Sequence, residues 1–349
     1  MKWKGHDRVP LRIVDPADSL ATNEISAIAP LIVSASRSTD IPAFYGDWFM
    51  ARLDAGYVRW NSPFGGNPVY VSFAKTRVIV FWSKNPAPFF RHLDSLDQKG
   101  YGYYFLISLN DYDAERLEPG VPPLEERIES FIRLSQRIGK GRVVWRYDPL
   151  VLSDTITVGT LLEKIRRTGD RIHPFTERLV ISFVDIEKYV KVKRNLHKGG
   201  YGDVREFTGA EISRFCEGLA RLNKNWGLTI TACGEARDLS GYGIGRGQCI
   251  SYDLMMKEFA GDRVLMEFLR PADQRTLSGT GARSPRDLRD PGQRNTCTCI
   301  VSKDIGQYST CMHLCAYCYA NTSPAVVQRQ YARYLEDAEQ GIFHDSITG

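Results

Sequence analysis

The sequence predicts an α/β fold in which parallel strands form a TIM-type or partial (β/α) barrel. Short β-branched and aromatic runs alternate repeatedly with segments of helical periodicity. Polar or charged residues follow the ends of most of these runs, as expected where parallel strands open at one mouth. The length of 349 residues suits either one large barrel or two smaller domains.

The apolar runs predict the strands. They are residues 31–36, 69–73, 78–82, 103–109, 142–145, 179–184 and 228–232. Pro86 and Pro149 follow two of these runs and disfavour their continuation.

Segments with helical periodicity lie between these runs. The predicted helices are 45–55, 124–138, 158–165 and 212–222. Gly56 and Gly139 follow the first two helices and are suited to end them. A last helix is predicted after Ser323, a good N-cap, and Pro324, a good first helical residue.

Composition changes divide the chain into five parts. We expect an N-terminal leader at 1–30, barrel units at 31–269, an arginine-rich loop at 270–294, a cysteine-rich unit at 295–340 and a tail at 341–349. The loop is rich in arginine, proline, glycine and serine, and we interpret it as solvated rather than as phosphate-binding.

The overall composition excludes several classes of protein. Apolar residues make up 43% and charged residues 25%, which excludes a disordered or fibrous chain. The net charge of +5 is too small to indicate a nucleic-acid-binding protein. The charged start (residues 1–10) lacks a signal peptide core, and no apolar run is long enough to span a membrane. We therefore expect a cytoplasmic protein with reduced thiols and no membrane partner.

Cysteines are the most informative residues in the sequence. Of the eight cysteines, Cys311, Cys315 and Cys318 form a CxxxCxxC motif. Thiolates suit iron–sulfur clusters or zinc. Three of them can hold three irons of a [4Fe–4S] cluster and leave the fourth iron open, whereas a closed structural site needs four protein ligands. The motif therefore favours a first cluster with an open iron.

Four further cysteines complete a second candidate set. They are Cys233, Cys249, Cys297 and Cys299, the complement of a fully ligated second [4Fe–4S] cluster or of a structural zinc. We favour iron–sulfur; the alternative is that Cys233 and Cys249 are buried core thiols. Cys216 lies on an apolar helical stripe and is expected in the core.

Zinc is also the alternative for the motif itself. His313 would then join Cys311, Cys315 and Cys318 in a zinc knuckle. Together with the basic loop and stacking aromatics, such a knuckle would suit a zinc-binding, nucleic-acid-binding protein without radical chemistry. The small net charge and the strand–helix alternation argue against that protein class.

The polar residues at the predicted strand ends are expected to converge on one mouth. They are Ser34, Arg37, Asp40, Lys84, Asn110, Asp111, Arg146, Asp148, Asp185 and Glu235.

The cysteine motif, with Tyr317 and Tyr319 around its last cysteine, resembles that of radical S-adenosylmethionine (SAM) enzymes, particularly the spore photoproduct lyase-like members. The resemblance implies reductive cleavage of SAM to a 5′-deoxyadenosyl radical, which takes hydrogen from a substrate. It leaves open lyase or oxidoreductase chemistry, and a small molecule or a nucleic-acid lesion as substrate. It also implies a reductant such as ferredoxin or flavodoxin.

The position of the motif differs from the usual radical SAM arrangement. The motif normally follows the first barrel strand, whereas here it stands near the C-terminus, after a strand expected at 300–302. Residues 38–42, 82–86 and 146–149 resemble later lyase-like segments. The resemblance therefore implies a circularly permuted barrel, with the cluster-binding βα unit moved to the end.

Longer stretches resemble an uncharacterised bacterial family, domain of unknown function eighteen forty-eight. They are residues 32–42, 81–88 and 144–149. This resemblance extends from about residue 30 to 335 and brings no established substrate.

The radical SAM resemblance also implies roles for strand-end residues. Lys84 is the first candidate to bind the SAM carboxylate, followed by Arg146 and Arg37, since an arginine fork pairs a carboxylate bidentately. Salt bridges that hold loops are the alternative for all three. Asp148 and Glu235 are candidates for ribose hydroxyls or substrate. Tyr147 is a candidate radical gate, so Tyr147 and Glu235 are the predicted catalytic residues.

Overall fold

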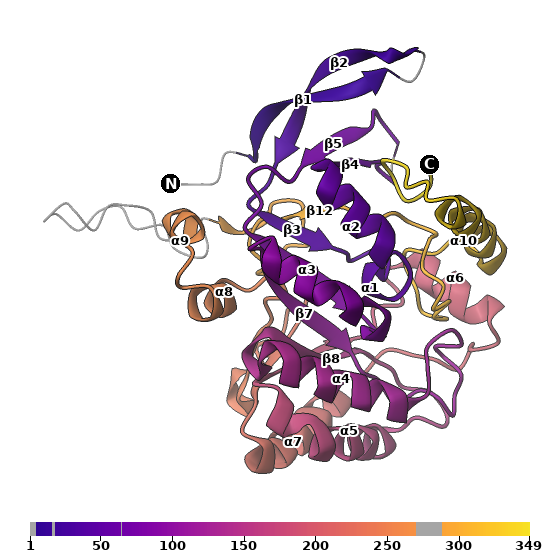
Figure 1. Cartoon of the computed structure of the whole chain (residues 1–349). Coiled ribbons are helices and arrows are strands. Elements are labelled where there is room, and N and C mark those ends of the chain that lie inside the picture. Colours follow the sequence, from indigo (N-terminus) through magenta and orange to yellow (C-terminus); the bar gives the residue numbers. More distant parts are fainter. Residues whose placement is uncertain (1–4, 16–17, 64, 270–287) are drawn as a thin grey trace, which may run out of the picture.

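The computed structural model describes residues 5–15, 18–63, 65–269 and 288–349. Its centre is an eight-stranded sheet in the order β11-β10-β9-β8-β7-β6-β3-β12, in which every neighbouring pair is parallel. A second sheet has the order β1-β2-β5-β4 and lies beside the first (Figure 1). The chain is therefore an α/β protein with a parallel sheet, as the alternation in the sequence predicts.

The parallel strands agree with most of the predicted runs. They are β3 (Ile32–Ala35), β6 (Val78–Ser83), β7 (Gly102–Ser108), β8 (Val143–Leu150), β9 (Arg178–Phe183), β10 (Thr229–Ala232), β11 (Ile244–Arg246) and β12 (Lys303–Asp304). Strands β11 and β12 stand at opposite ends of the strand order. Within the described residues, the sheet is thus compatible with a partial barrel and does not close through these edges.

Helices follow the strands, and most of them cover the outer side of the sheet (Figure 1). They are α1 (Ile41–Phe44), α2 (Gly46–Ala55), α3 (Leu93–Gln98), α4 (Leu124–Ile138), α5 (Val158–Ile172), α6 (Val190–Lys198), α7 (Gly209–Trp226), α8 (Tyr252–Glu258), α9 (Arg263–Leu269) and α10 (Pro324–Glu339). Short 3₁₀ turns are η1 (Ala87–His92), η2 (Lys140–Arg142), η3 (His173–Phe175) and η4 (Ser240–Tyr242).

Local signals explain where these helices begin and end. Helix α4 has its predicted bounds, and it ends at Gly139, whose φ of 92° is one that glycine adopts without strain. Helix α5 continues past the predicted end at 165 because Ile172 extends its buried face. Its polar stretch contains Gly169, where a Cβ would lie 2.4 Å from the Trp226 ring. Close packing against Trp226 therefore explains an extension that periodicity alone does not reveal.

Alternation along the strands builds two cores, one on each side of the parallel sheet. On β6, Ile79 and Phe81 join the core formed with the outer helices, whereas Val78 and Val80 join the inner one. Residues from α8, α9 and the segment around Cys297 and Cys299 contribute to the inner core. The sheet is thus buried on both faces, as parallel sheets are.

The predicted N-terminal leader is a β-hairpin. Strands β1 (Asp7–Asp15) and β2 (Asp18–Ala29) pair antiparallel and project from the rest of the molecule (Figure 1). Strand β5 (Val69–Ser72) pairs with β2 and with β4 (Tyr57–Trp60), so the predicted strand at 69–73 belongs to this second sheet. Pro10 weakens the strand signal of β1, but proline is tolerated on an edge strand.

The C-terminal unit attaches to the edge of the parallel sheet. Strand β12 pairs with β3 through Lys303 and Asp304, slightly later than the predicted strand at 300–302. The cysteine motif then leads to α10, where the Ser323 side chain accepts a hydrogen bond from the Val326 backbone as predicted for an N-cap.

The arginine-rich loop expected at 270–294 lies largely outside the described residues, which resume at Leu288. Among the helices that are described, none has the length and apolar character needed to cross a membrane.

Candidate functional site

A cavity of about 810 Å³ opens at the carboxyl ends of the parallel strands; we call it the mouth cavity. Most of the polar side chains predicted to converge there do so. Those that line the cavity are Arg37, Asp40, Lys84, Arg146, Asp148 and Asp185. Ser34, Asn110, Asp111 and Glu235 do not belong to its lining. Strand-end position therefore identifies the mouth, but not every side chain in it.

All seven cysteines proposed as metal ligands line this one cavity. They are Cys233, Cys249, Cys297, Cys299, Cys311, Cys315 and Cys318. The eighth, Cys216, is buried on α7 away from the cavity, as predicted. Burial raises the pKa of Cys216 to about 12, so this thiol stays protonated and inert.

The first cysteine set consists of Cys311, Cys315 and Cys318. Burial raises the pKa of all three thiols, that of Cys311 to about 12. Distant elements hold their loop: Asn195 on α6 donates to the Cys318 carbonyl at 2.9 Å, and Tyr45 donates to the Thr310 carbonyl at 2.7 Å. The loop is thus anchored on both sides of the motif. Neutral thiols are the stable form of this loop until a cation binds to them.

The second cysteine set brings together three separate segments of the chain. Cys233 follows β10, Cys249 follows β11, and Cys297 and Cys299 precede β12. The sulfurs of Cys233 and Cys249 are 3.6 Å apart, and the backbone N–H groups of Cys249 and Ile250 donate to Cys299 Sγ. Hydrogen bonds from Cys249 and Cys297, together with Arg37, lower the pKa of Cys299. The set is therefore a compact thiol cluster with a thiolate already favoured.

The donor chemistry of both sets fits iron–sulfur clusters. No group of three or more His, Cys, Asp and Glu side chains in the described part of the chain is placed to hold a metal ion. A four-iron cluster requires a different arrangement of sulfur atoms from a single metal ion, because each of its thiolates binds a different iron atom. Soft thiolates in a cavity, three in one set and four in the other, match an open and a closed cluster.

His313, within the cysteine loop, connects this loop to residues outside it. Its Nε2 lies 2.7 Å from an oxygen of Asp40, and its Nδ1 lies 3.1 Å from the Gly120 carbonyl. The same Asp40 oxygen accepts hydrogen bonds from Ser83 and from the Lys84 backbone. Both ring nitrogens are thus engaged, so His313 would have to give up a partner to complete a zinc knuckle.

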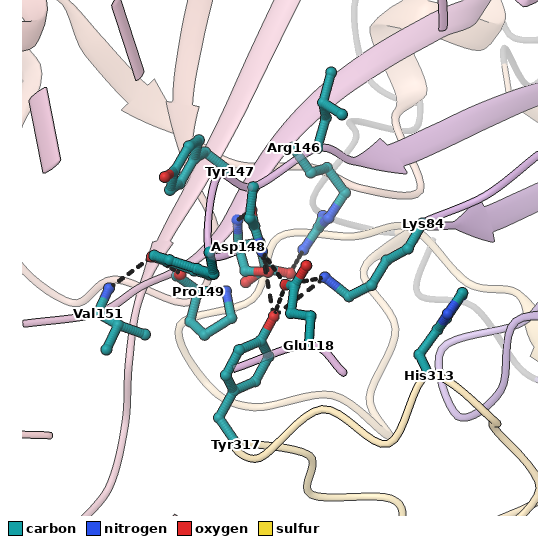
Figure 2. A network of polar contacts seen from close by, with 12 residues as sticks. Lys84, Glu118, Arg146, Tyr147, Asp148, Pro149, Val151, His313 and Tyr317 are labelled. Atoms are coloured by element: carbon teal, nitrogen blue, oxygen red, sulfur yellow. Dashed lines mark hydrogen bonds and ion pairs between the residues drawn. The ribbon is translucent and has the colours of Figure 1, made fainter. Parts of the chain in front are cut away.

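A buried charge network lies beside the first cysteine set (Figure 2). Lys84 Nζ is 2.8 Å from Glu118 Oε1 and 3.2 Å from the Tyr317 hydroxyl. Asn110 also donates to Glu118 Oε1, whereas Glu118 Oε2 has no hydrogen-bond partner among the described residues and lies 3.9 Å from Arg127 Nη1. Although burial acts against both charges, Glu118 raises the pKa of Lys84 and Lys84 lowers the pKa of Glu118. Both groups therefore remain ionised at neutral pH.

Glu118 is the member of this network that the sequence analysis missed. It lies in the long segment between β7 and α4, outside any motif. Only its proximity to Lys84 and Tyr317 reveals its role, and that proximity is set by the fold.

The two arginines predicted at the mouth lie by the second cysteine set. Arg146 donates to Cys249 Sγ and pairs with Asp148, which also accepts from Ser182. Its guanidinium lies 4.9 Å from the Trp82 ring centre, and that of Arg37 lies 5.5 Å from it. Lys84 is thus the predicted cation associated with the first set, and the arginines are associated with the second.

Neither predicted catalytic residue reaches the cavity. Tyr147 alternates with Arg146 and Asp148 along β8, so it faces the outer core, where its hydroxyl accepts from the Asp111 backbone. It points away from the network in Figure 2. Glu235 accepts from the Arg237 backbone at 2.7 Å, outside the cavity lining. The structure thus places both residues outside the cavity lining, because strand-end position does not say which face a side chain occupies.

Comparison with known proteins gives a family but no activity. The model of a family described as "Domain of unknown function (DUF1848)" matches residues 32–320. The match spans the parallel strands and both cysteine sets. No curated protein and no solved structure matches the chain.

Proposed function

The chain belongs to this family of unknown function, and we propose that it is an iron–sulfur enzyme of the radical SAM type. The observation that carries the proposal is the convergence of seven cysteines on one cavity at the carboxyl ends of parallel strands. Three of them form the CxxxCxxC motif, which leaves one iron of a four-iron cluster without a protein ligand.

Cys311, Cys315 and Cys318 would hold the open cluster. When bound, the cluster and SAM supply a 5′-deoxyadenosyl radical, which takes a hydrogen atom from the substrate. The chain itself supplies binding, orientation and exclusion of water. The loop around the motif, half-buried and anchored by Asn195 and Tyr45, would contribute to that exclusion.

Lys84 is the residue we assign to the SAM carboxylate. It lines the mouth cavity, and its Nζ lies 3.2 Å from the hydroxyl of Tyr317, which stands within the motif between Cys315 and Cys318. The Lys84 ammonium has three donors, so it can keep Glu118 as a partner while it binds a second carboxylate. Glu118 and Tyr317 would hold Lys84 in position. Asp148 remains a candidate for ribose hydroxyls, since it lines the same cavity.

The second cysteine set would hold a closed cluster. Cys233, Cys249, Cys297 and Cys299 supply four thiols, and hydrogen bonds from backbone N–H groups to Cys299 Sγ stabilise a ligating thiolate. Such a cluster would relay electrons from a reductant such as ferredoxin or flavodoxin to the open one.

The position of β12 supports a circularly permuted barrel as part of the proposal. This strand pairs with β3 at the edge of the sheet, and the cysteine motif and α10 follow it. A strand, a cluster-binding loop and a helix therefore stand together beside the first strand of the remaining barrel. This is the place that the first βα unit of an unpermuted barrel would take.

Anaerobic reconstitution with iron and sulfide tests the proposal. We expect about eight irons per chain, because each cluster holds four, a brown protein, and 5′-deoxyadenosine released from SAM under reduction. About four irons would limit the proposal to one cluster. A colourless protein that binds zinc instead of iron would refute it.

A further inference from the structure

One of the cations that line the mouth cavity has no carboxylate partner among the residues that the structure describes. The other positively charged or imidazole side chains in the cavity lining have one within 4.0 Å: Arg37 with Asp304, Lys84 with Glu118, Arg146 with Asp148, Arg294 with Asp185 and His313 with Asp40. Lys303 lines the same cavity, and it makes neither an ion pair nor a hydrogen bond with any residue that the structure describes.

An aromatic ring takes the place of that missing partner. The Lys303 ammonium lies 3.3 Å from the centre of the Trp60 ring. The Trp60 Nε1 donates to the Gly306 carbonyl at 3.0 Å, which fixes the ring against the segment after β12. A cation on an aromatic face is stabilised, but none of its three N–H donors has an acceptor among the described residues. Lys303 and Trp60 therefore present two features to the cavity: an aromatic ring held in place and a positive charge beside it.

The charged groups around Lys303 are committed elsewhere. Asp304, its neighbour on β12, accepts from Ser34 and from the Arg37 backbone, and Asp290 accepts from the Gly292 backbone. His6 is a further titratable group nearby: burial lowers its pKa, and the charge of Lys303 lowers it further. Burial lowers the pKa of Lys303 to about 8, and the attraction of Asp304 and Asp290 only partly offsets that effect. An anion that entered the cavity would meet a cation with free donors.

We propose that Lys303 and Trp60 form an anion-binding subsite of the mouth cavity, which takes a carboxylate or phosphate group of the substrate. Trp60 would pack against the planar or apolar part next to that group. That the ligand is the substrate rests on the function proposed above, whereas the binding of an anion does not. The subsite lies where Trp60 of β4 in the second sheet meets Lys303 of β12 in the parallel sheet, and Lys84 remains the cation for SAM.

The charge of Lys303 predicts how pH affects this subsite. A bound anion favours the ammonium form, so it raises the pKa of Lys303. Anion binding near pH 8 should therefore take up a proton, and affinity should fall as the pH rises above 8. Titration calorimetry with inorganic phosphate in buffers of different ionisation enthalpy measures this uptake. The Lys303→Met variant should abolish it, and Lys303→Arg should retain phosphate binding without the proton uptake.

Pyridoxal 5′-phosphate is a direct probe, because it carries both an anion and an aldehyde. The Lys303 amine would add to the aldehyde carbon with loss of water, and cyanoborohydride would reduce the resulting imine to a stable secondary amine. Peptide mapping of the full chain should show Lys303 modified about tenfold or more faster than Lys84, whose amine is held charged by Glu118. Excess phosphate or succinate should slow the reaction, and the stronger competitor identifies the preferred anion.

The outcomes separate the subsite from the proposed function. Equal reaction of Lys303 and Lys84, or no protection by either anion, would overturn the subsite, and so would unchanged phosphate binding by Lys303→Met. The iron content of the same samples reports on the clusters. A protein that binds iron but leaves Lys303 unprotected refutes the subsite alone, whereas a protected Lys303 without iron refutes only the radical SAM proposal and leaves an anion site.

Discussion

The two cysteine sets share one cavity but are assembled in different ways. The first, Cys311 to Cys318, comes from a single loop whose spacing is visible in the sequence. The second joins Cys233 and Cys249, which follow adjacent strands β10 and β11, to Cys297 and Cys299, which precede β12. A local set needs only its loop to be anchored, whereas a dispersed set exists only when the sheet is complete. Loss of tertiary structure should therefore dissolve the second set before the first.

The largest expected effect comes from removing one thiol of the local set. In Cys315→Ala the open cluster loses a ligand, so we expect loss of about four irons and no 5′-deoxyadenosine from SAM. Iron analysis and product chromatography measure both. Cys216→Ala is the matched control, because this thiol is buried outside the cavity. SAM cleavage that survives in Cys315→Ala would contradict the role of the motif.

A thiol of the dispersed set gives the complementary test. In Cys299→Ala the two backbone donors of Cys249 and Ile250 lose their sulfur acceptor, and about four irons should again be lost. Cleavage of SAM with dithionite should persist, since the open cluster is intact. Retention of all iron would show that Cys299 is not a ligand.

Glu118→Gln tests the network that supports the first set. It leaves the Lys84 ammonium buried without its carboxylate, which should lower the free energy of unfolding by about 3 kcal/mol. Urea unfolding measures the loss, and adding Lys84→Met should recover part of it. Glu163→Gln, in an exposed pair with Arg166, should change stability little. An equally small effect of Glu118→Gln would show that the pair is not stabilising.

The stability difference between wild type and Glu118→Gln should change with pH in a defined direction. Burial acts to raise the pKa of Glu118, but Lys84 and Arg127 lower it below its ordinary value of 4.5. Its contribution is therefore complete above about pH 4.5 and is lost as the pH falls through the lowered pKa. The stability difference between wild type and Glu118→Gln should shrink in that acidic range. A difference that grew on acidification would contradict this assignment.

Gly120→Ala separates the anchoring of the loop from its ligands. A Cβ at Gly120 would lie 2.2 Å from the Met312 carbonyl, so the cysteine loop must shift. We expect a loss of about 1–3 kcal/mol in stability and weaker iron binding by the first set alone. Gly159→Ala on α5 has open space, with its nearest atom at 3.8 Å, and should be neutral or slightly stabilising. Equal effects of the two substitutions would rule out the close approach at Gly120.

The smallest effect is expected at Arg146, which contacts the dispersed set. Arg146→Met removes the donor to Cys249 Sγ, and fewer hydrogen bonds to a ligating sulfur should make the reduction potential of the second cluster more negative. Potentiometric titration followed by electron paramagnetic resonance would resolve the two clusters. A change in the reduction potential of the first cluster alone would contradict the assignment of Arg146 to the second cysteine set.

Much of the fold can be predicted from local sequence patterns, and where such a prediction fails the physical cause can be identified. The run at 124–138 has one buried stripe and a terminal glycine, so α4 has its predicted bounds. Strand β11 has only three residues, too few to establish a period, and it is not predicted. Val9, Leu11 and Ile13 alternate along β1, but Pro10 between them weakens the strand signal, and this strand is not predicted. The segment expected as a leader contains the β1–β2 hairpin.

The candidate site also has one part that the sequence predicts and another that it does not. By itself the sequence determined the local chemistry: the spacing of Cys311, Cys315 and Cys318, and a mouth rich in polar residues. Only the tertiary structure decided which side chains face one another. It placed Tyr147 in the outer core, paired Lys84 with Glu118, and packed Lys303 against the Trp60 ring. The physical reason is that such pairings join residues distant in the chain. Strand register and the face that each residue occupies set them, and neither is encoded in any single segment.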